Sequence, residues 1–143
     1  MNIVPMEEKH RNAVKNMMRI FYRSPAVHSN GSEEIFDSDI DNCINECQFL
    51  EGYVFCHEEE ILGYSMIAKS FSTEFGKPCI WIEDIFVKEE HRGKGIGKSF
   101  FDYIDKKYPN ALKRLEAESE NKGAVRLYKN CGFDILPYLE LIK

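Results

Sequence analysis

The feature that most constrains the fold is a glycine-rich turn between two segments of opposite periodicity. The segment KPCIWIEDIFV (77–87) is apolar and rich in β-branched and aromatic residues, as is typical of a buried strand. The glycine-rich sequence HRGKGIG (91–97) follows, and apolar residues then repeat at helical spacing from Ile96 to Ile104. A strand, a glycine loop and a helix in this order build an anion site, because free backbone N–H groups converge with the positive end of the helix.

Periodicity and turn signals elsewhere predict a mixed α/β chain that forms one layered domain over residues 1–143. The expected element order is β-α-α-β-β-β-α-β-α-β-β. Ser32 and Asn121 have side chains suited to cap helices. The strands are expected at 2–5, 52–59, 61–71, 77–87 and 113–119, with two short closing strands around Pro137 in 133–143, and the helices at 7–22, 32–47, 96–107 and 121–131.

Composition excludes several classes of protein. No apolar run approaches the roughly 20 residues that span a bilayer, and the N-terminal MNIVPMEEKHR has charges where a signal peptide needs an apolar stretch. The five cysteines are odd in number and include no CxxC pair, so reduced thiols and no metal site are expected. We therefore expect a cytoplasmic protein without a membrane or nucleic-acid partner.

Charge is distributed unevenly along the chain. Residues 24–68 contain ten acids and no Lys or Arg, whereas residues 88–129 contain eleven basic residues and seven acids. The second half suits an anion, and the first half could attract a cation. Acids that are merely solvated on a helix surface are the alternative explanation for the first half.

Two nucleotide-binding motifs do not fit the glycine turn. A P-loop needs a glycine five positions before Gly97, where this chain has Arg92, and the later strand RLEAES lacks a magnesium-binding aspartate at its end. The dinucleotide fingerprint would need glycine at position 98, which is Lys98. A turn that simply caps a helix is the alternative without a ligand.

What remains is the pattern R-x-x-G-x-G, formed by Arg92, Gly95 and Gly97. Together with IEDIFVKEEHRGKGIGKSFF (82–101) and ESENKGAVRLYKNCGF (118–133), it resembles the GCN5-related N-acetyltransferase (GNAT) family. This resemblance implies a mixed, mostly antiparallel central sheet flanked by helices, with acetyl-CoA as cosubstrate. It also implies that the cofactor is held by Ile85, Phe86, Val87, Arg92, Gly93, Gly95, Ile96, Gly97 and Asn121, with Arg126 as a further phosphate candidate. Lys94 and Lys98 are expected to add positive charge near the phosphates, with solvated surface lysines as the alternative. A cap without a ligand is the alternative role for Asn121.

Acetyl transfer to an amine needs a base for the protonated amine and an acid for the departing thiolate. Glu83 lies at a position similar to that of the base proposed in spermidine/spermine N-acetyltransferases, and Asp84 is the second candidate for the base. Tyr128 matches a family tyrosine that faces the sulfur of coenzyme A. The backbone of residues 85–87 would polarise the thioester carbonyl. A solvent-facing carboxylate and a core-packing aromatic are the alternatives.

The expected reaction is direct attack by a primary amine in a ternary complex, and the expected acceptor is a small and possibly cationic molecule. A protein lysine or N-terminal acetyltransferase and a non-catalytic CoA-binding module remain alternatives, because no shared motif selects the acceptor. A homodimer is one candidate assembly.

Overall fold

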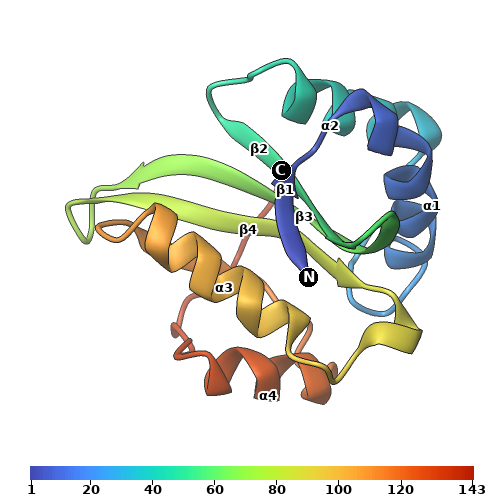
Figure 1. Cartoon of the computed structure of the whole chain (residues 1–143). Helices are drawn as coiled ribbons and strands as arrows, with labels where there is room; N and C mark the ends of the chain where they lie inside the picture. The colour runs from blue at the N-terminus through green and yellow to red at the C-terminus, as the bar shows by residue number, and fades with distance from the viewer.

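The computed structural model describes all residues, 1–143, and is built around one five-stranded sheet (Figure 1). Three strand pairs are antiparallel and the pair β4–β5 is parallel, as a mixed, mostly antiparallel sheet requires. In chain order the elements are β1 (Asn2–Pro5), α1 (Arg11–Phe21), α2 (Glu33–Ile44), β2 (Leu50–His57), β3 (Glu60–Ser72), β4 (Lys77–Val87), α3 (Ile96–Lys107), β5 (Leu112–Leu115) and α4 (Lys122–Asn130), with 3-10 turns at Glu8–His10 and Glu89–His91.

The helices form a layer on each face of the sheet (Figure 1). Val14, Met18 and Ile40 from α1 and α2 pack with Val54 and Tyr64 in a core on one face. The opposite face packs against α3 in a second core that includes Tyr53, Phe55, Ile67, Phe100 and Ile104. Because both faces are covered, β2 and β3 are continuously buried along their centres, and this explains their largely apolar sequences.

Local signals set most element boundaries. The Ser32 hydroxyl accepts a hydrogen bond from the backbone N–H of Ile35 at the start of α2, and the Asn121 side chain accepts one from Ala124 at the start of α4. Both caps were predicted, and the predicted strand 77–87 matches β4 to the residue. The predicted end of the second helix near Cys47 was three residues too late.

The C-terminal end differs from the prediction. β5 ends at Leu115 rather than Ser119, and residues 133–143 form no strand, so the two closing strands are absent. A strand needs a neighbouring strand for its backbone hydrogen bonds, and this segment pairs with no strand of its own chain.

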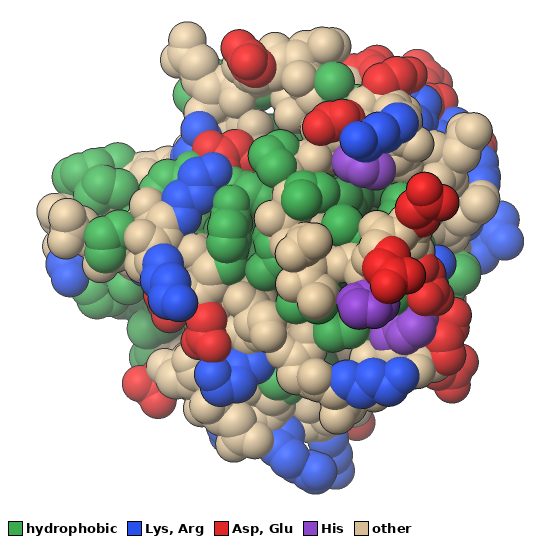
Figure 2. All heavy atoms as spheres, viewed as in Figure 1, with side chains coloured by type: hydrophobic (Ala, Val, Ile, Leu, Met, Phe, Trp, Pro, Cys, Tyr) green, Lys and Arg blue, Asp and Glu red, His purple; other side chains and the backbone are tan.

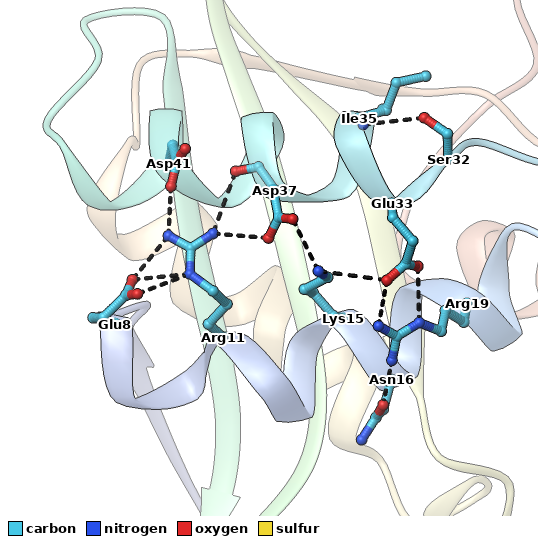
Figure 3. A network of polar contacts seen from close by, with 10 residues as sticks. All are labelled: Glu8, Arg11, Lys15, Asn16, Arg19, Ser32, Glu33, Ile35, Asp37 and Asp41. Carbon is cyan, nitrogen blue, oxygen red and sulfur yellow. Dashed lines mark hydrogen bonds and ion pairs between the residues drawn. The ribbon is translucent and has the colours of Figure 1, made fainter.

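Ion pairs join α1 to α2 (Figure 3). Arg11 contacts Glu8, Asp37 and Asp41, Lys15 Nζ lies 2.9 Å from Asp37 Oδ2, and Arg19 pairs with Glu33. Three of the ten acids in residues 24–68 are therefore neutralised by cations from α1.

Candidate active site

The site lies where β4 and β5 separate. The two strands pair in parallel from Cys79 and Leu112 to Ile82 and Leu115, and no pairing continues beyond those residues. The chain then leaves β5 toward α4, so a pocket opens between the second half of β4, the end of β5 and α4. Its walls include Ile85, Asn121 and Tyr128.

A bulge in β4 divides the two candidate carboxylates. Asp84 is paired with Met66 and Ile82 with Ile67, which leaves Glu83 as an extra residue without a partner on β3. Regular alternation along a strand would put Ile82 and Asp84 on the same face of the sheet. The extra residue in the bulge shifts this alternation by one position, so the two side chains point to opposite faces. Ile82 packs in the core beside α3, whereas Asp84 is directed to the face covered by α1.

Asp84 is enclosed within the protein. It is 4% exposed, and its two carboxylate oxygens accept hydrogen bonds from Tyr22 Oη at 2.7 Å and Tyr64 Oη at 2.8 Å. Burial raises the pKa of Asp84 to about 6, although the two tyrosine hydroxyls oppose this rise. Asp84 does not line the pocket, and its contacts hold the end of α1 against the sheet.

Glu83 has a different environment. The residue is more exposed than Asp84, and its carboxyl lines the pocket together with Tyr128, where pocket residues partly enclose it. Partial burial, followed by the charges of Asp84 and Glu140, raises the pKa of its carboxyl. The structure thus brings the first predicted base and the predicted acid into one pocket and leaves the second predicted base outside it.

Tyr128 is half-buried on α4. Its ring packs edge-on against Phe101, at 5.9 Å between ring centroids, and against Phe133 at 6.1 Å. Burial raises the pKa of its hydroxyl. Tyr128 can therefore pack in the core and also face the pocket, because its ring contacts core residues while the residue lines the pocket.

The glycine loop ends at the N-terminus of α3. Gly93 and Gly95 have φ of 73° and 80°, a left-handed backbone that side-chain-bearing residues rarely adopt. The first hydrogen bond of α3 runs from Ser99 N to Gly95 O at 2.9 Å, so the N–H groups of residues 96–98 have no acceptor within the helix. These groups, with the helix dipole, form a surface suited to a phosphate.

Gly97 is packed more tightly than the other loop glycines. A Cβ at Gly93 or Gly95 would have no neighbour within 4 Å, whereas one at Gly97 would lie 3.3 Å from Leu127 Cδ2 of α4. The small size of Gly97 thus also allows α3 and α4 to approach each other.

The basic side chains near this loop differ in whether they already have a partner within the chain. Arg92 turns back, so that its Nε donates to Val87 O at 2.8 Å and its guanidinium lies over Phe86. Lys98 pairs with Asp102 one turn further along α3. Lys94, in the loop, and Arg126, on α4, are exposed. Phe86 is itself a core residue, so its side chain is not free to bind a ligand.

The pocket also contains residues that the sequence did not single out. Phe21 and Ala26 close it from the side of α1, and Glu116, the first residue after β5, lines it together with Glu83. Burial, a hydrogen bond with Glu140 and the charge of Glu83 raise the pKa of Glu116 to about 7. The parallel alignment of β4 and β5, had it been recognised, would have pointed to Glu116, because residues that follow paired strand ends share one edge.

No group of three or more His, Cys, Asp or Glu side chains is placed to hold a metal ion. The five cysteines are not joined by disulfides. None of the helices combines the length and the apolar character needed for a membrane span.

Comparison with known proteins identifies the family. The profile of the acetyltransferase (GNAT) family matches residues 14–133, which include β4, the glycine loop and α4. The chain belongs to this family. Among solved structures, a GNAT-type match is AAC(6')-Iy in complex with the bisubstrate analogue CoA-S-monomethyl-acetylneamine, with a TM-score of 0.80, 12% identity, and coverage of 99% of this chain and 96% of that one. At this identity the match shows a shared fold.

Two curated relatives of this GNAT chain are amine acetyltransferases. Thialysine N-epsilon-acetyltransferase from Bos taurus is 38% identical over 76 residues, which cover 50% of this chain and 44% of the relative. Spermine/spermidine N(1)-acetyltransferase from Bacillus subtilis (strain 168) is 23% identical over 94 residues, which cover 62% of each protein. The matched regions thus span 44% and 62% of the length of these two relatives.

Proposed function

We propose that residues 1–143 act as a single acetyl-CoA-dependent N-acetyltransferase domain that acetylates a small primary amine by direct attack in a ternary complex. The observation that carries this proposal is the shared pocket of Glu83 and Tyr128, which opens where β4 and β5 separate. A carboxylate and a phenol in one pocket supply the base and the acid that the reaction needs.

The residues after β4 fit coenzyme A. The free N–H groups of residues 96–98 and the open space beside Gly93 and Gly95 suit a pyrophosphate, with Lys94 and Arg126 available for further phosphate contacts. When bound, acetyl-CoA supplies an activated acetyl group on a thioester. Beyond Ile82, β4 remains paired with β3 but has no strand on its other edge. That open edge would orient the pantetheine arm, and an N–H there would polarise the carbonyl.

Glu83 would take a proton from the acceptor ammonium, directly or through a water molecule. An alkylamine has a pKa of about 10, so most of it is protonated at neutral pH and cannot attack. The raised pKa of Glu83 makes its carboxylate a stronger base than a fully solvated one. Tyr128 would donate its proton to the departing thiolate. A phenol with a pKa of about 10 is protonated at neutral pH, and burial, which raises the pKa of Tyr128, keeps it in this form.

We propose a cationic acceptor, attracted by fewer acids than the ten in residues 24–68. Glu33, Asp37 and Asp41 are paired with α1 and contribute little net field at the pocket (Figure 3). Asp39 is half-buried, and this burial, followed by the charge of nearby Glu83, raises the pKa of its carboxyl. These two carboxylates, rather than the whole acidic segment, would attract a diamine or polyamine.

A screen of amines with acetyl-CoA, read out by release of free thiol, tests the proposal. We expect turnover with small basic amines, and a loss of about 10²- to 10⁴-fold in kcat/KM for Glu83→Gln at neutral pH, typical of a missing general base. Raising the pH should restore part of this loss, because the amine is then already neutral. Glu59→Gln, which alters an exposed acid in the β2–β3 turn, is the matched control.

Other results would lead to other functions. Tight acetyl-CoA binding without turnover of any amine would indicate a CoA-binding module. Acetylation confined to peptide substrates would indicate a protein acetyltransferase. Magnesium-dependent ATP binding without affinity for coenzyme A would overturn the cofactor assignment.

A further inference from the structure

One wall of the pocket is formed by the end of α1 and by the connection from α1 to α2. Phe21 and Ala26 line the pocket there, and Glu83 lines it from β4. None of residues 91–98 of the glycine loop lines the pocket, so this wall is separate from the phosphate site. It bounds the space in which an acceptor amine would meet Glu83.

The connection itself, residues 22–32, has little backbone support. No backbone-to-backbone hydrogen bond involves residues 25–31. Ser24 Oγ donates to Phe21 O at 2.6 Å and accepts from Ala26 N at 3.2 Å, which fixes only the first turn. Side chains of both charges gather over α1 and α2 (Figure 2), but their ion pairs join the two helices to each other and not to the sheet. The position of the connection therefore depends on other side-chain contacts.

Tyr22 supplies a contact between this connection and the sheet. Its Oη donates to Asp84 Oδ1 of β4 at 2.7 Å. Its ring lies edge-on to Phe21, at 5.1 Å between centroids, and 5.4 Å from the ring of Phe36 on α2. The far end of the connection packs on the same rings, since a Cβ at Gly31 would lie 2.5 Å from Phe36 Cε1 and 3.5 Å from Tyr22 Cδ1. Tyr22 thus contacts both ends of the connection.

Asp84 is fixed in the sheet independently of α1. Tyr64 Oη donates to its second carboxylate oxygen at 2.8 Å, and Ser65 Oγ donates to its backbone oxygen at 2.7 Å. Both donors belong to β3. Asp84 follows Glu83 directly in the β4 bulge. The hydrogen bond from Tyr22 therefore attaches the pocket wall to a point next to the proposed base.

The phenol of Tyr22 lies among three carboxylates. Burial, followed by the charge of Asp84 and the hydrogen bond to it, raises the pKa of Tyr22, and the charges of Asp39 and Glu83 add to the rise. The phenol is therefore protonated at neutral pH, where Asp84, with a pKa of about 6, is ionised. A hydrogen bond to an ionised acceptor is stronger than one between neutral groups.

We propose that Tyr22 is a positioning residue for the acceptor amine, because its hydrogen bond to Asp84 holds the wall of Phe21 and Ala26 at a set distance from Glu83. This inference rests on the acetyl transfer proposed above. Without the bond, the connection is free to move away from β4, and the acceptor loses a wall that orients it toward the base. The phosphate site on α3 is not attached to the connection through this bond and should keep its affinity.

Two variants that each remove one hydroxyl from Asp84 test the proposal. Tyr22→Phe deletes the bond that reaches the pocket wall, and Tyr64→Phe, the matched control, deletes the bond from within the sheet. Spermidine, or the best amine of the screen, is the acceptor. Tyr22→Phe should raise the KM of the acceptor roughly 2- to 10-fold, the range that loss of one hydrogen bond corresponds to. Its acetyl-CoA affinity, measured by calorimetry, should match that of the wild type.

Tyr64→Phe should leave the KM of the acceptor close to the wild-type value. Amide exchange gives a second measurement that does not need turnover. The amides of residues 22–24 are hydrogen-bonded at the end of α1 and should exchange faster in Tyr22→Phe than in Tyr64→Phe. Circular dichroism and thermal melting check folding. If Tyr22→Phe does not fold, Asp84→Asn, which keeps an oxygen acceptor without its charge, takes its place and should raise the same KM.

Three results would overturn the positioning role. If the wild type acetylates amines and Tyr22→Phe has an unchanged KM for the acceptor, the role is wrong while the acetyltransferase stands. Equal rises in KM for both variants would mean that any loss at Asp84 has this effect, so that the attachment of the wall is not the cause. No turnover of any amine by the wild type would refute the proposed function, and the positioning role with it.

Discussion

Replacing Asp84 by asparagine should change how the stability of this GNAT chain depends on pH. In the folded protein the pKa of Asp84 is about 6, against 3.8 for an unperturbed Asp, so the folded state binds this proton more tightly than the unfolded state. The stability that Asp84 contributes is therefore greatest below pH 3.8 and falls as the pH rises through 6. A pKa rise of this size corresponds to about 3 kcal/mol at 1.36 kcal/mol per pH unit.

An asparagine side chain cannot ionise, so the Asp84→Asn variant should lack this part of the pH dependence. Urea unfolding of both proteins between about pH 4 and 7.5 gives the difference in unfolding free energy, wild type minus variant, and we expect it to fall by about 2–3 kcal/mol across this range. Asp102→Asn, at an exposed carboxyl on α3, should show no comparable change. Tyr22→Phe removes one hydrogen bond from the carboxylate and should move the transition to higher pH.

If the difference in unfolding free energy does not change with pH, the argument is refuted. Such a result would mean that the effect of burial on the pKa of Asp84 is cancelled by the two tyrosine hydrogen bonds. A difference that rises with pH would mean that the tyrosine hydroxyls dominate and that the folded-state pKa lies below 3.8.

Further predictions concern the pocket and the glycine loop. Tyr128→Phe should lower kcat while leaving acetyl-CoA affinity nearly unchanged, and equal turnover in an assay limited by chemistry would assign the hydroxyl no part in the reaction. Gly97→Val should weaken acetyl-CoA binding measured by calorimetry. The same change in a Leu127→Ala background, which removes the packing neighbour, should still weaken it if close approach of the cofactor is the cause. A diamine should exceed a monoamine of similar length in kcat/KM at low salt, and high salt or Asp39→Asn should reduce this preference. Equal rates at low salt would remove the cationic acceptor.

Acids that neighbour one another in sequence differ in their surroundings once the chain is folded. Glu83 and Asp84 are adjacent, but the bulge places one at the pocket and the other between Tyr22 and Tyr64. Glu116 and Glu140 become neighbours only in the folded chain, and burial together with this contact raises the pKa of Glu116. No periodicity in the sequence shows a bulge, because it depends on the register between two strands.

The sequence by itself determined the features that depend on near neighbours. The caps at Ser32 and Asn121, the strand 77–87, the glycine turn and the helix that follows all rest on side chains and backbone preferences within a few residues of each other. The family resemblance was readable for the same reason, since its motifs are contiguous stretches, and the match over residues 14–133 confirmed it.

Tertiary structure alone decided what depends on distant partners. It neutralised Glu33 and Asp37 with cations of α1, gathered Phe21, Glu83 and Tyr128 around one pocket, and left the predicted closing strands of 133–143 unpaired. The apolar residues of that tail read as strands in the sequence, but a strand is stable only when another strand satisfies its N–H and C=O groups. Whether such a partner is within reach is a property of the folded chain, because the hydrogen bonds that define a sheet join residues that the sequence keeps far apart.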